Sequence, residues 1–165
     1  MTAIFEPVDG DGKGPLERDV QAFLAENLSS SLGESLTLIG TEYSVAVGRI
    51  DILAQDAQGC FVVVELKLGA ASRDAIGQLQ SYMGALAQEN PETFVRGVLV
   101  AASIDPGAEA ALQVARDIQF VSYILTFKFF AEFASRSTFQ EWKERGKKPT
   151  VSGNLEIWLP TSFKK

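Results

Sequence analysis

The stretch "GRIDILAQDAQGCFVVVELKLG", Gly48 to Gly69, decides how this sequence folds. Two apolar runs flank the turn-like residues Asp56 to Gly59, which is the pattern of a β-hairpin. The apolar runs nevertheless contain Asp51, Glu65 and Lys67, although charged side chains are costly to bury. Because burying three charges costs free energy, we expect these residues to have a function.

The register of this hairpin brings two of the charges together. A tight turn at Asp56 to Gly59 pairs residues whose numbers sum to about 115 or 116, so Asp51 lies opposite Glu65 or one step from it. Because side chains alternate between the faces of a strand, Lys67 shares a face with Glu65. Directly opposite Cβ atoms are roughly 4.5–5.5 Å apart, so the two carboxylates repel each other unless a cation lies between them.

Two explanations fit this arrangement. In the first, a divalent cation takes both carboxylates as ligands, and Lys67 is directed at the same place. In the second, Lys67 neutralises one carboxylate in a structural ion pair. The second explanation leaves the other carboxylate without a partner, and buried ion pairs contribute little to stability. The sequence therefore favours a metal site.

Composition limits the kind of metal and the kind of chemistry. The 165 residues suit a single domain and contain no histidine and one cysteine, Cys60. Ser-His-Asp and Cys-His nucleophiles, His-ligated metals and Cys₄ sites are therefore excluded. Oxygen ligands remain, and these favour Mg²⁺, Mn²⁺ or Ca²⁺. The sequence shows neither a signal-peptide pattern nor an apolar run of roughly 18–20 residues, so we expect a cytoplasmic protein with no membrane partner.

The charge is distributed unevenly. The net charge of −6 argues against a general nucleic-acid binder, yet residues 1–127 contain 7 basic and 17 acidic residues and residues 128–165 contain 8 basic and 4 acidic ones. The basic cluster "KERGKK" is either a solvated tail or a source of phosphate contacts. The second interpretation assigns nucleic-acid binding to Lys143, Arg145, Lys147 and Lys148.

Hydrophobic periodicity predicts an α/β fold. Residues 16–28 form a helical pattern that ends at the serine-rich Ser29 to Gly33. Strand patterns follow at residues 35–45 and in both arms of the hairpin. Then come a helix with Ser72 as N-cap, a buried strand at residues 95–103, a helix with Pro106 in its first turn, and a strand at residues 118–127. This order predicts a mixed sheet flanked by helices, with a parallel crossover at its end.

The chain divides into three predicted parts. Residues 1–14 are glycine-rich and polar and form a flexible leader. Residues 15–127 form the core, and residues 128–165 form a basic C-terminal extension that packs on the core.

The spacing of the charged residues matches a known motif. Asp51, thirteen intervening residues, Glu65, one residue and Lys67 form the D-x(n)-E-x-K pattern of the PD-(D/E)XK nucleases. In the next helix, Gln78 and Tyr82 are four residues apart and share a face, which resembles the Q-x(3)-Y motif of the RecB-like branch. Together with the segments around them, from Leu16 to Phe127, these motifs resemble the C-terminal nuclease domain of the NucS/EndoMS family.

The resemblance implies a restriction-endonuclease-like αβββαβ core followed by a further crossover helix and strand. It also implies DNA phosphodiester hydrolysis with Mg²⁺ or Mn²⁺. Asp51 and Glu65 would bind the ion with the backbone carbonyl of Leu66, and Glu17 would bind through water or a second ion. The remaining implied roles are activation of water and phosphate contact, for Lys67, Gln78, Tyr82 and Arg49.

Members of this family cut double-stranded DNA, including at mismatches, as dimers, and an N-terminal domain supplies DNA binding. About fifteen residues precede the first motif helix here, so we expect a stand-alone nuclease domain or one that binds DNA through other parts. The expected function is a DNA endonuclease in repair or defence, and the resemblance implies a homodimer. The alternatives are a non-cleaving nucleic-acid-binding or protein-interaction module, and a nuclease subunit that needs a partner for DNA binding.

Overall fold

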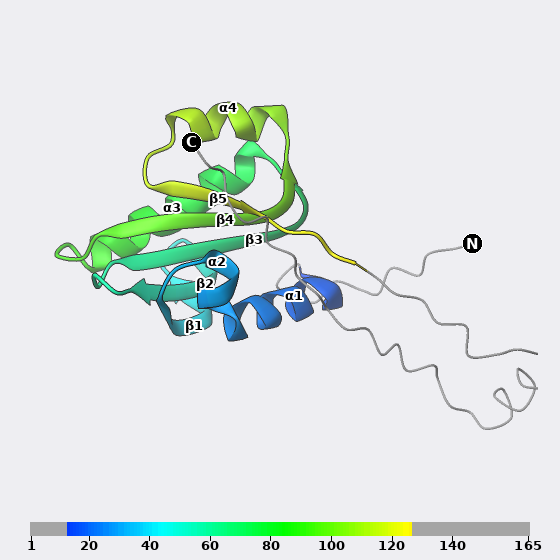
Figure 1. The fold of residues 1–165 in the computed structure, drawn as a ribbon. Coiled ribbons are helices and arrows are strands. Elements are labelled where there is room, and N and C mark those ends of the chain that lie inside the picture. Colours follow the sequence, from blue (N-terminus) through cyan, green and yellow to red (C-terminus); the bar gives the residue numbers. More distant parts are fainter. Residues whose placement is uncertain (1–12, 127–165) are drawn as a thin grey trace, which may run out of the picture. The chain divides into compact units, whose positions relative to one another are not determined.

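The computed structural model describes residues 13–126. Its elements, in chain order, are α1 (Pro15–Glu26), α2 (Leu28–Leu32), β1 (Leu36–Val45), β2 (Gly48–Asp56), β3 (Phe61–Ala71), α3 (Arg73–Glu89), β4 (Val95–Ile104), α4 (Pro106–Val114) and β5 (Ile118–Ser122) (Figure 1). The predicted order of helix, three strands, helix, strand, helix and strand is confirmed, with the short α2 in addition.

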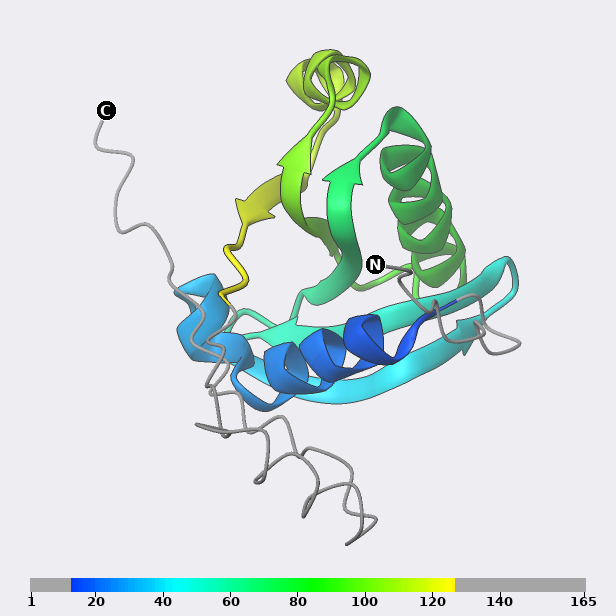
Figure 2. The same ribbon diagram turned by 90° about the vertical axis from the view of Figure 1, so that its right-hand side faces the viewer.

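The five strands of the described residues form one sheet in the order β1-β2-β3-β4-β5. The pairs β1–β2 and β2–β3 are antiparallel, whereas β3–β4 and β4–β5 are parallel. The sheet is therefore mixed, as predicted, and α4 connects two parallel neighbours. The strands β1 and β2 turn away from β3, β4 and β5, which gives the sheet a strong twist (Figure 2).

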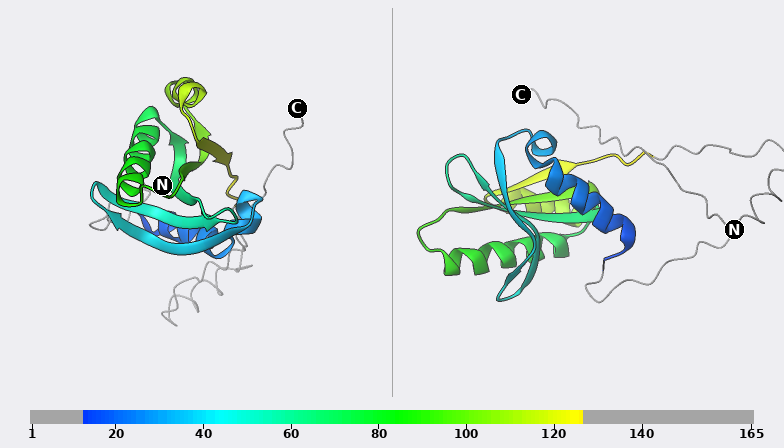
Figure 3. Two further views of the ribbon diagram at one scale, coloured as in Figure 1. Left: turned by 90° about the vertical axis from the view of Figure 1, so that its left-hand side faces the viewer. Right: turned by 90° about the horizontal axis from the view of Figure 1, so that it is seen from below.

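Helices cover both faces of the sheet. Helices α1 and α2 lie on one face and α3 lies on the other, beside α4 (Figures 2 and 3). The face under α3 holds a continuous apolar core that joins Leu79 of α3 with residues of β2, β3 and β4, among them Leu53, Val63 and Leu99. The predicted apolar stripe of α3 is confirmed, because Ile76, Leu79 and Leu86 are buried and Met83 is partly buried.

The predicted start signals of α3 and α4, Ser72 and Pro106, are confirmed, and Asp105 adds a cap that was not predicted. The Ser72 side chain accepts a hydrogen bond from the Asp74 amide at 3.3 Å, and Asp105 accepts one from the Ala108 amide at 2.6 Å. Pro106 occupies the first turn of α4. These caps fix where each helix begins relative to the strand that precedes it.

Two boundaries differ from the sequence-based expectation. The serine-rich segment continues as α2 and ends at Gly33, whose φ of 72° suits glycine. Strand β5 ends at Ser122 and does not continue through residue 126. There the Tyr123 hydroxyl turns toward β3 and donates to the Leu68 carbonyl oxygen at 2.7 Å.

The predicted leader, apart from Lys13 and Gly14, and the predicted C-terminal extension lie outside the described residues. None of the helices within residues 13–126 combines the length and the apolar character that crossing a membrane requires.

Candidate active site

The hairpin of β2 and β3 has the predicted register. Ile52 pairs with Val64 and Gln55 with Phe61, so the numbers of paired residues sum to 116. Asp56 closes the turn, because its side chain accepts hydrogen bonds from the amides of residues 58 and 60. One step beyond the last ladder pair, where β2 and β3 separate, Asp51 and Glu65 face each other across the strands.

Glu65 is the most deeply buried charged residue of the site, with 1% of its surface exposed. Its Oε1 lies 2.8 Å from the Lys67 Nζ, whereas its Oε2 is buried and has no hydrogen-bond partner within the described residues. Burial, and next to it the negative charge of Asp51, raise the pKa of Glu65 to about 7. A buried carboxylate oxygen without a donor is the kind of atom that a cation satisfies.

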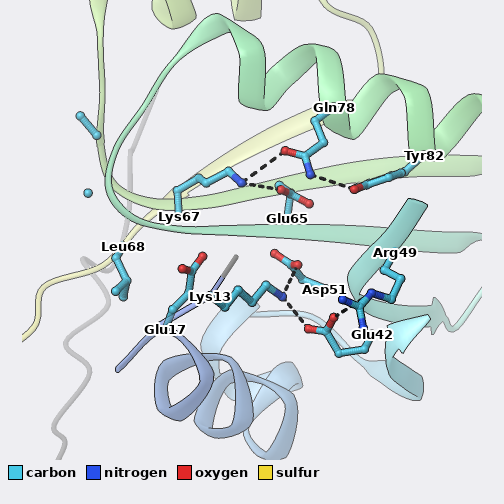
Figure 4. A pocket seen from close by; sticks show the side chains of 12 residues that line it. Lys13, Glu17, Glu42, Arg49, Asp51, Glu65, Lys67, Leu68, Gln78 and Tyr82 are labelled. Carbon is cyan, nitrogen blue, oxygen red and sulfur yellow. Dashed lines mark hydrogen bonds and ion pairs between the residues drawn. The ribbon is translucent and has the colours of Figure 1, made fainter. Parts of the chain in front are cut away.

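Lys67 connects the strand to helix α3. Its ammonium donates to the Gln78 Oε1 at 3.3 Å, and the Gln78 amide nitrogen donates to the Tyr82 hydroxyl at 2.8 Å (Figure 4). Burial disfavours the charge of Lys67, but the hydrogen bond that Lys67 donates to Glu65 and the charges of Glu65, Asp51 and Glu17 outweigh it, so the pKa of Lys67 is raised. The structure thus brings Lys67, Gln78 and Tyr82 into one chain of contacts, as the motif implies.

Asp51 is 4% exposed and is held through both carboxylate oxygens. Its Oδ2 accepts a hydrogen bond from the Leu66 amide at 2.7 Å, and its Oδ1 lies 2.5 Å from the Lys13 ammonium. The amide of Leu66, a fully buried residue between Glu65 and Lys67, therefore ties β3 to β2 where the ladder stops. Asp51 also has a cationic partner of its own, which the sequence did not reveal.

Three residues of the site were missed in the sequence. Lys13 contacts Asp51, Glu42 and Gln21, and the Gln21 amide nitrogen donates to the Glu42 Oε1 at 2.8 Å and to the Asp51 carbonyl oxygen at 2.9 Å. Burial opposes the charge of Lys13, yet hydrogen bonds to Asp51 and Glu42 raise its pKa. Glu42 has a φ of 50°, which is uncommon for a residue with a side chain.

Glu17 and Arg49 complete the wall of a cavity of about 530 Å³, to which Lys13 and Glu42 also contribute but Gln21 does not. Glu17 comes from α1, and its charge contributes to the raised pKa of Lys67. Arg49 is half exposed, and its Nε lies 3.8 Å from the Glu42 Oε2. The cavity is lined by Lys13, Glu17, Glu42, Arg49, Asp51, Glu65, Lys67, Leu68, Gly69, Ala70, Gln78 and Tyr82 (Figure 4).

The other predicted nucleic-acid-binding residues, Lys143, Arg145, Lys147 and Lys148, lie outside the described residues. Their contribution stays a prediction.

The donors of the cavity suit a hard cation. Asp51 and Glu65 offer carboxylate oxygens, and one of these, the Glu65 Oε2, is buried without a donor. Within residues 13–126, no three side chains of the types His, Cys, Asp and Glu are grouped closely enough to hold a metal by themselves. A cation here would therefore complete its coordination with backbone oxygen and water, as Mg²⁺ commonly does.

Comparisons with known proteins show which family the chain resembles. The family model for the endonuclease NucS C-terminal domain matches residues 16–123. Endonuclease NucS of Kocuria rhizophila is 40% identical over 105 residues, which are 64% of this chain and 43% of that protein. Endonuclease NucS of Micrococcus luteus is 42% identical over 96 residues, 58% of this chain and 41% of that protein. The chain thus spans less than half the length of these curated relatives.

Solved structures lead to the same family. A repair endonuclease from Pyrococcus abyssi aligns with a TM-score of 0.57 and 30% identity, covering 67% of this chain and 46% of that one. A complex of EndoMS with double-stranded DNA aligns with a TM-score of 0.55 and 27% identity, covering 73% of this chain and 49% of that one. The aligned parts support a shared nuclease-domain fold.

Proposed function

The chain belongs to the endonuclease NucS C-terminal domain family, and on that premise we propose that it is a nuclease domain that hydrolyses DNA phosphodiester bonds with Mg²⁺ or Mn²⁺. The observation that supports this proposal most directly concerns the Glu65 carboxylate. Its Oε2 is buried in a polar cavity beside Asp51 without a hydrogen-bond donor from the described residues. A purely structural carboxylate at this depth would be expected to have both oxygens satisfied.

The roles of the acidic residues follow from their positions. Asp51 and Glu65 would hold the ion, and the backbone carbonyl of Leu66 is the proposed third ligand. Glu17, on the α1 side of the cavity, would contribute through water or a second ion. When bound, such an ion lowers the pKa of water and neutralises charge that develops on the phosphate.

Lys67 would orient the attacking water and stabilise negative charge in the transition state. Its position supports this role, because Glu65 and Gln78 hold its ammonium at 2.8 and 3.3 Å and it remains one third exposed to the cavity. Tyr82 supports Gln78 from the next turn of α3. The three residues would act as one unit that fixes the position of a single positive charge. Arg49, at the mouth of the cavity, would contact a phosphate.

DNA is the proposed substrate because relatives point to it. The Pyrococcus abyssi neighbour is a repair endonuclease, and EndoMS has been solved with double-stranded DNA. We extend both properties, DNA repair and duplex binding, to this chain as proposals. Residues 1–127 carry 17 acidic and 7 basic residues, which favours a second candidate, a nuclease subunit whose partner supplies DNA affinity.

A cleavage panel tests the proposal. Duplex, mismatched, branched and single-stranded DNA, and RNA, are each incubated with the protein in Mg²⁺, in Mn²⁺ or in excess EDTA, with Asp51→Asn as the matched control. We expect cleavage of DNA with either ion and none in EDTA or with the variant. Robust cleavage in EDTA would contradict the metal assignment. Cleavage only after addition of a partner would favour the subunit, and none under any condition would favour a non-cleaving module.

A further inference from the structure

Oxygen atoms from three elements form a binding site for the ammonium of Lys13, here called the Lys13 site. The ammonium is 2.5 Å from the Asp51 Oδ1 on β2, 2.5 Å from the Glu42 Oε1 on β1 and 2.7 Å from the Gln21 Oε1 on α1. A lysine ammonium has three N–H donors, so these three oxygens can satisfy all of them. Only 12% of the side chain is exposed. The contact is therefore a specific one and not a loose surface ion pair.

The residues of the Lys13 site are held in place independently of Lys13. The buried Gln21 amide nitrogen donates to Glu42 and to the Asp51 carbonyl oxygen, which fixes the three groups relative to one another. Glu42 adopts its positive φ of 50° between Thr41 and Tyr43, which pair with Ile52 and Ile50 of β2. Such a conformation costs of order 1–3 kcal/mol and persists where surrounding structure enforces it.

The Lys13 site and the proposed metal site share one atom. The Asp51 Oδ2 is engaged by the Leu66 amide, so the Oδ1 is the oxygen that remains for a cation, and Lys13 occupies it. A divalent ion and an ammonium on the same carboxylate oxygen would repel each other strongly in a buried place. Asp51 can therefore serve one of the two cations fully, but not both.

We propose that Lys13 is an internal competitor for the metal site: its ammonium occupies Asp51 in the metal-free protein and must leave that oxygen when a divalent ion binds. This inference rests on the proposed function, because it concerns the same site. It assigns to the segment just before α1 the role of holding a replaceable cation, which keeps the Asp51 and Glu42 charges neutralised while the metal is absent.

Calorimetric titration of Mn²⁺ tests this competition. Lys13→Met should bind Mn²⁺ about 5- to 150-fold more tightly than the wild type, the usual range for two coupled ligands. The matched control is Arg49→Met, which removes the same charge beside Glu42, where the Arg49 Nε lies 3.8 Å from Oε2, but leaves the ammonium of Lys13 on Asp51. The control should change Mn²⁺ affinity by much less. Equal affinity in the wild type and Lys13→Met, or equal tightening in both variants, would overturn the inference.

Amine labelling followed by mass spectrometry gives a second readout that needs no variant. Lys13 should be protected in the metal-free wild type and become reactive on addition of Mn²⁺. Protection that is unchanged by bound Mn²⁺ would overturn the inference and leave the metal site intact. Failure of the wild type and of Lys13→Met to bind Mn²⁺ at all would instead contradict the proposed function, so the two failures are distinguishable.

Discussion

Glu65 shows how the surroundings of a single residue indicate its function. Its carboxyl is buried between β3 and α3 with one oxygen paired to Lys67, and the other oxygen has no donor within the described residues. The sequence already placed this glutamate opposite Asp51, because the turn at Asp56 fixes the register. What the sequence did not show is that each carboxylate has its own lysine, Lys67 for Glu65 and Lys13 for Asp51. The ion-pair explanation therefore no longer leaves a whole carboxylate without a partner. It still leaves one buried oxygen, the Glu65 Oε2, without a donor from the described residues.

The raised pKa of Glu65 predicts how stability depends on pH. Because burial and Asp51 raise this pKa from 4.5 to about 7, the folded state prefers the protonated form. The stability that this preference contributes is fully present below about pH 4.5 and is lost as the pH rises to about 7, up to about 3 kcal/mol.

Urea unfolding in EDTA at several pH values between about 4.5 and 7.5 measures this effect. Other groups titrate as well, so the comparison is between wild type and Glu65→Gln, which cannot ionise. The free energy of unfolding should fall more steeply with pH in the wild type. Parallel curves for the two proteins would contradict the assignment of a raised pKa to Glu65.

Helix α3 positions the site through one close contact with β2. Gly48, at the start of β2, has a φ of 147°, and a Cβ added there would lie 3.1 Å from the Tyr82 Cε1 and 3.2 Å from its hydroxyl oxygen. Tyr82 in turn holds Gln78, and Gln78 accepts from Lys67. The approach of α3 to β2 therefore depends on the missing side chain at Gly48.

Gly48→Ala should displace Tyr82 and lower stability by about 1–3 kcal/mol through backbone strain. Cleavage should fall further than stability explains, because the support of Lys67 is moved. Gly84→Ala is the matched control: it lies two residues from Tyr82 on α3, is exposed, and has open space around its added Cβ. The control should gain up to about 1 kcal/mol from helix propensity and retain activity. Equal effects of both substitutions on thermal unfolding and on DNA cleavage would refute this role of Gly48.

At the scale of elements, much of the fold and half of the site could be predicted. Period-two alternation, the turn at Asp56 to Gly59, the Ser72 cap and Pro106 in a first turn are local signals, and each correctly predicted the observed element. The contacts of Lys13 with Asp51 and of Gln21 with Glu42 join residues 38 and 21 positions apart, which no local pattern encodes. Glu42 was also missed because it lies between the pairs Thr41–Ile52 and Tyr43–Ile50, and no local signal in the sequence fixes this register of β1 with β2.

For the molecule as a whole, the uneven charge predicts where DNA affinity comes from. The segment Lys143 to Lys148 lies in the basic part of the chain, outside the described residues. Replacing Lys143, Arg145, Lys147 and Lys148 together should weaken DNA binding similarly for all sequences and flatten its salt dependence, by a slope of roughly 0.9 per lost phosphate contact. Fluorescence anisotropy at several salt concentrations measures this slope. An unchanged slope would mean that the segment makes no phosphate contacts.

Cutting both strands of a duplex requires two active sites, or one site that binds twice. The segment "FKFFAEF", residues 127–133, offers apolar side chains for an interface between two copies of the chain. We therefore predict a homodimer. Light scattering at micromolar concentration should give twice the mass of 17.9 kDa without DNA, and that mass plus the mass of the DNA when DNA is bound. A monomeric mass under both conditions would assign these phenylalanines to another role.

The central claim is that Asp51 and Glu65 form a metal site and not merely a pair of structural ion pairs, and thermal unfolding with and without Mn²⁺ tests it most directly. The wild type should gain about 5 °C or more when Mn²⁺ is present at about 100 times its Kd, because the ion binds only the folded site. Lys67→Met removes a cation but no ligand, so it should keep this gain while cleavage falls about 10²- to 10³-fold. Asp51→Asn should lose the gain. If Mn²⁺ does not raise the unfolding temperature of the wild type, or raises that of Asp51→Asn equally, the charged residues of the hairpin are structural and the account is contradicted.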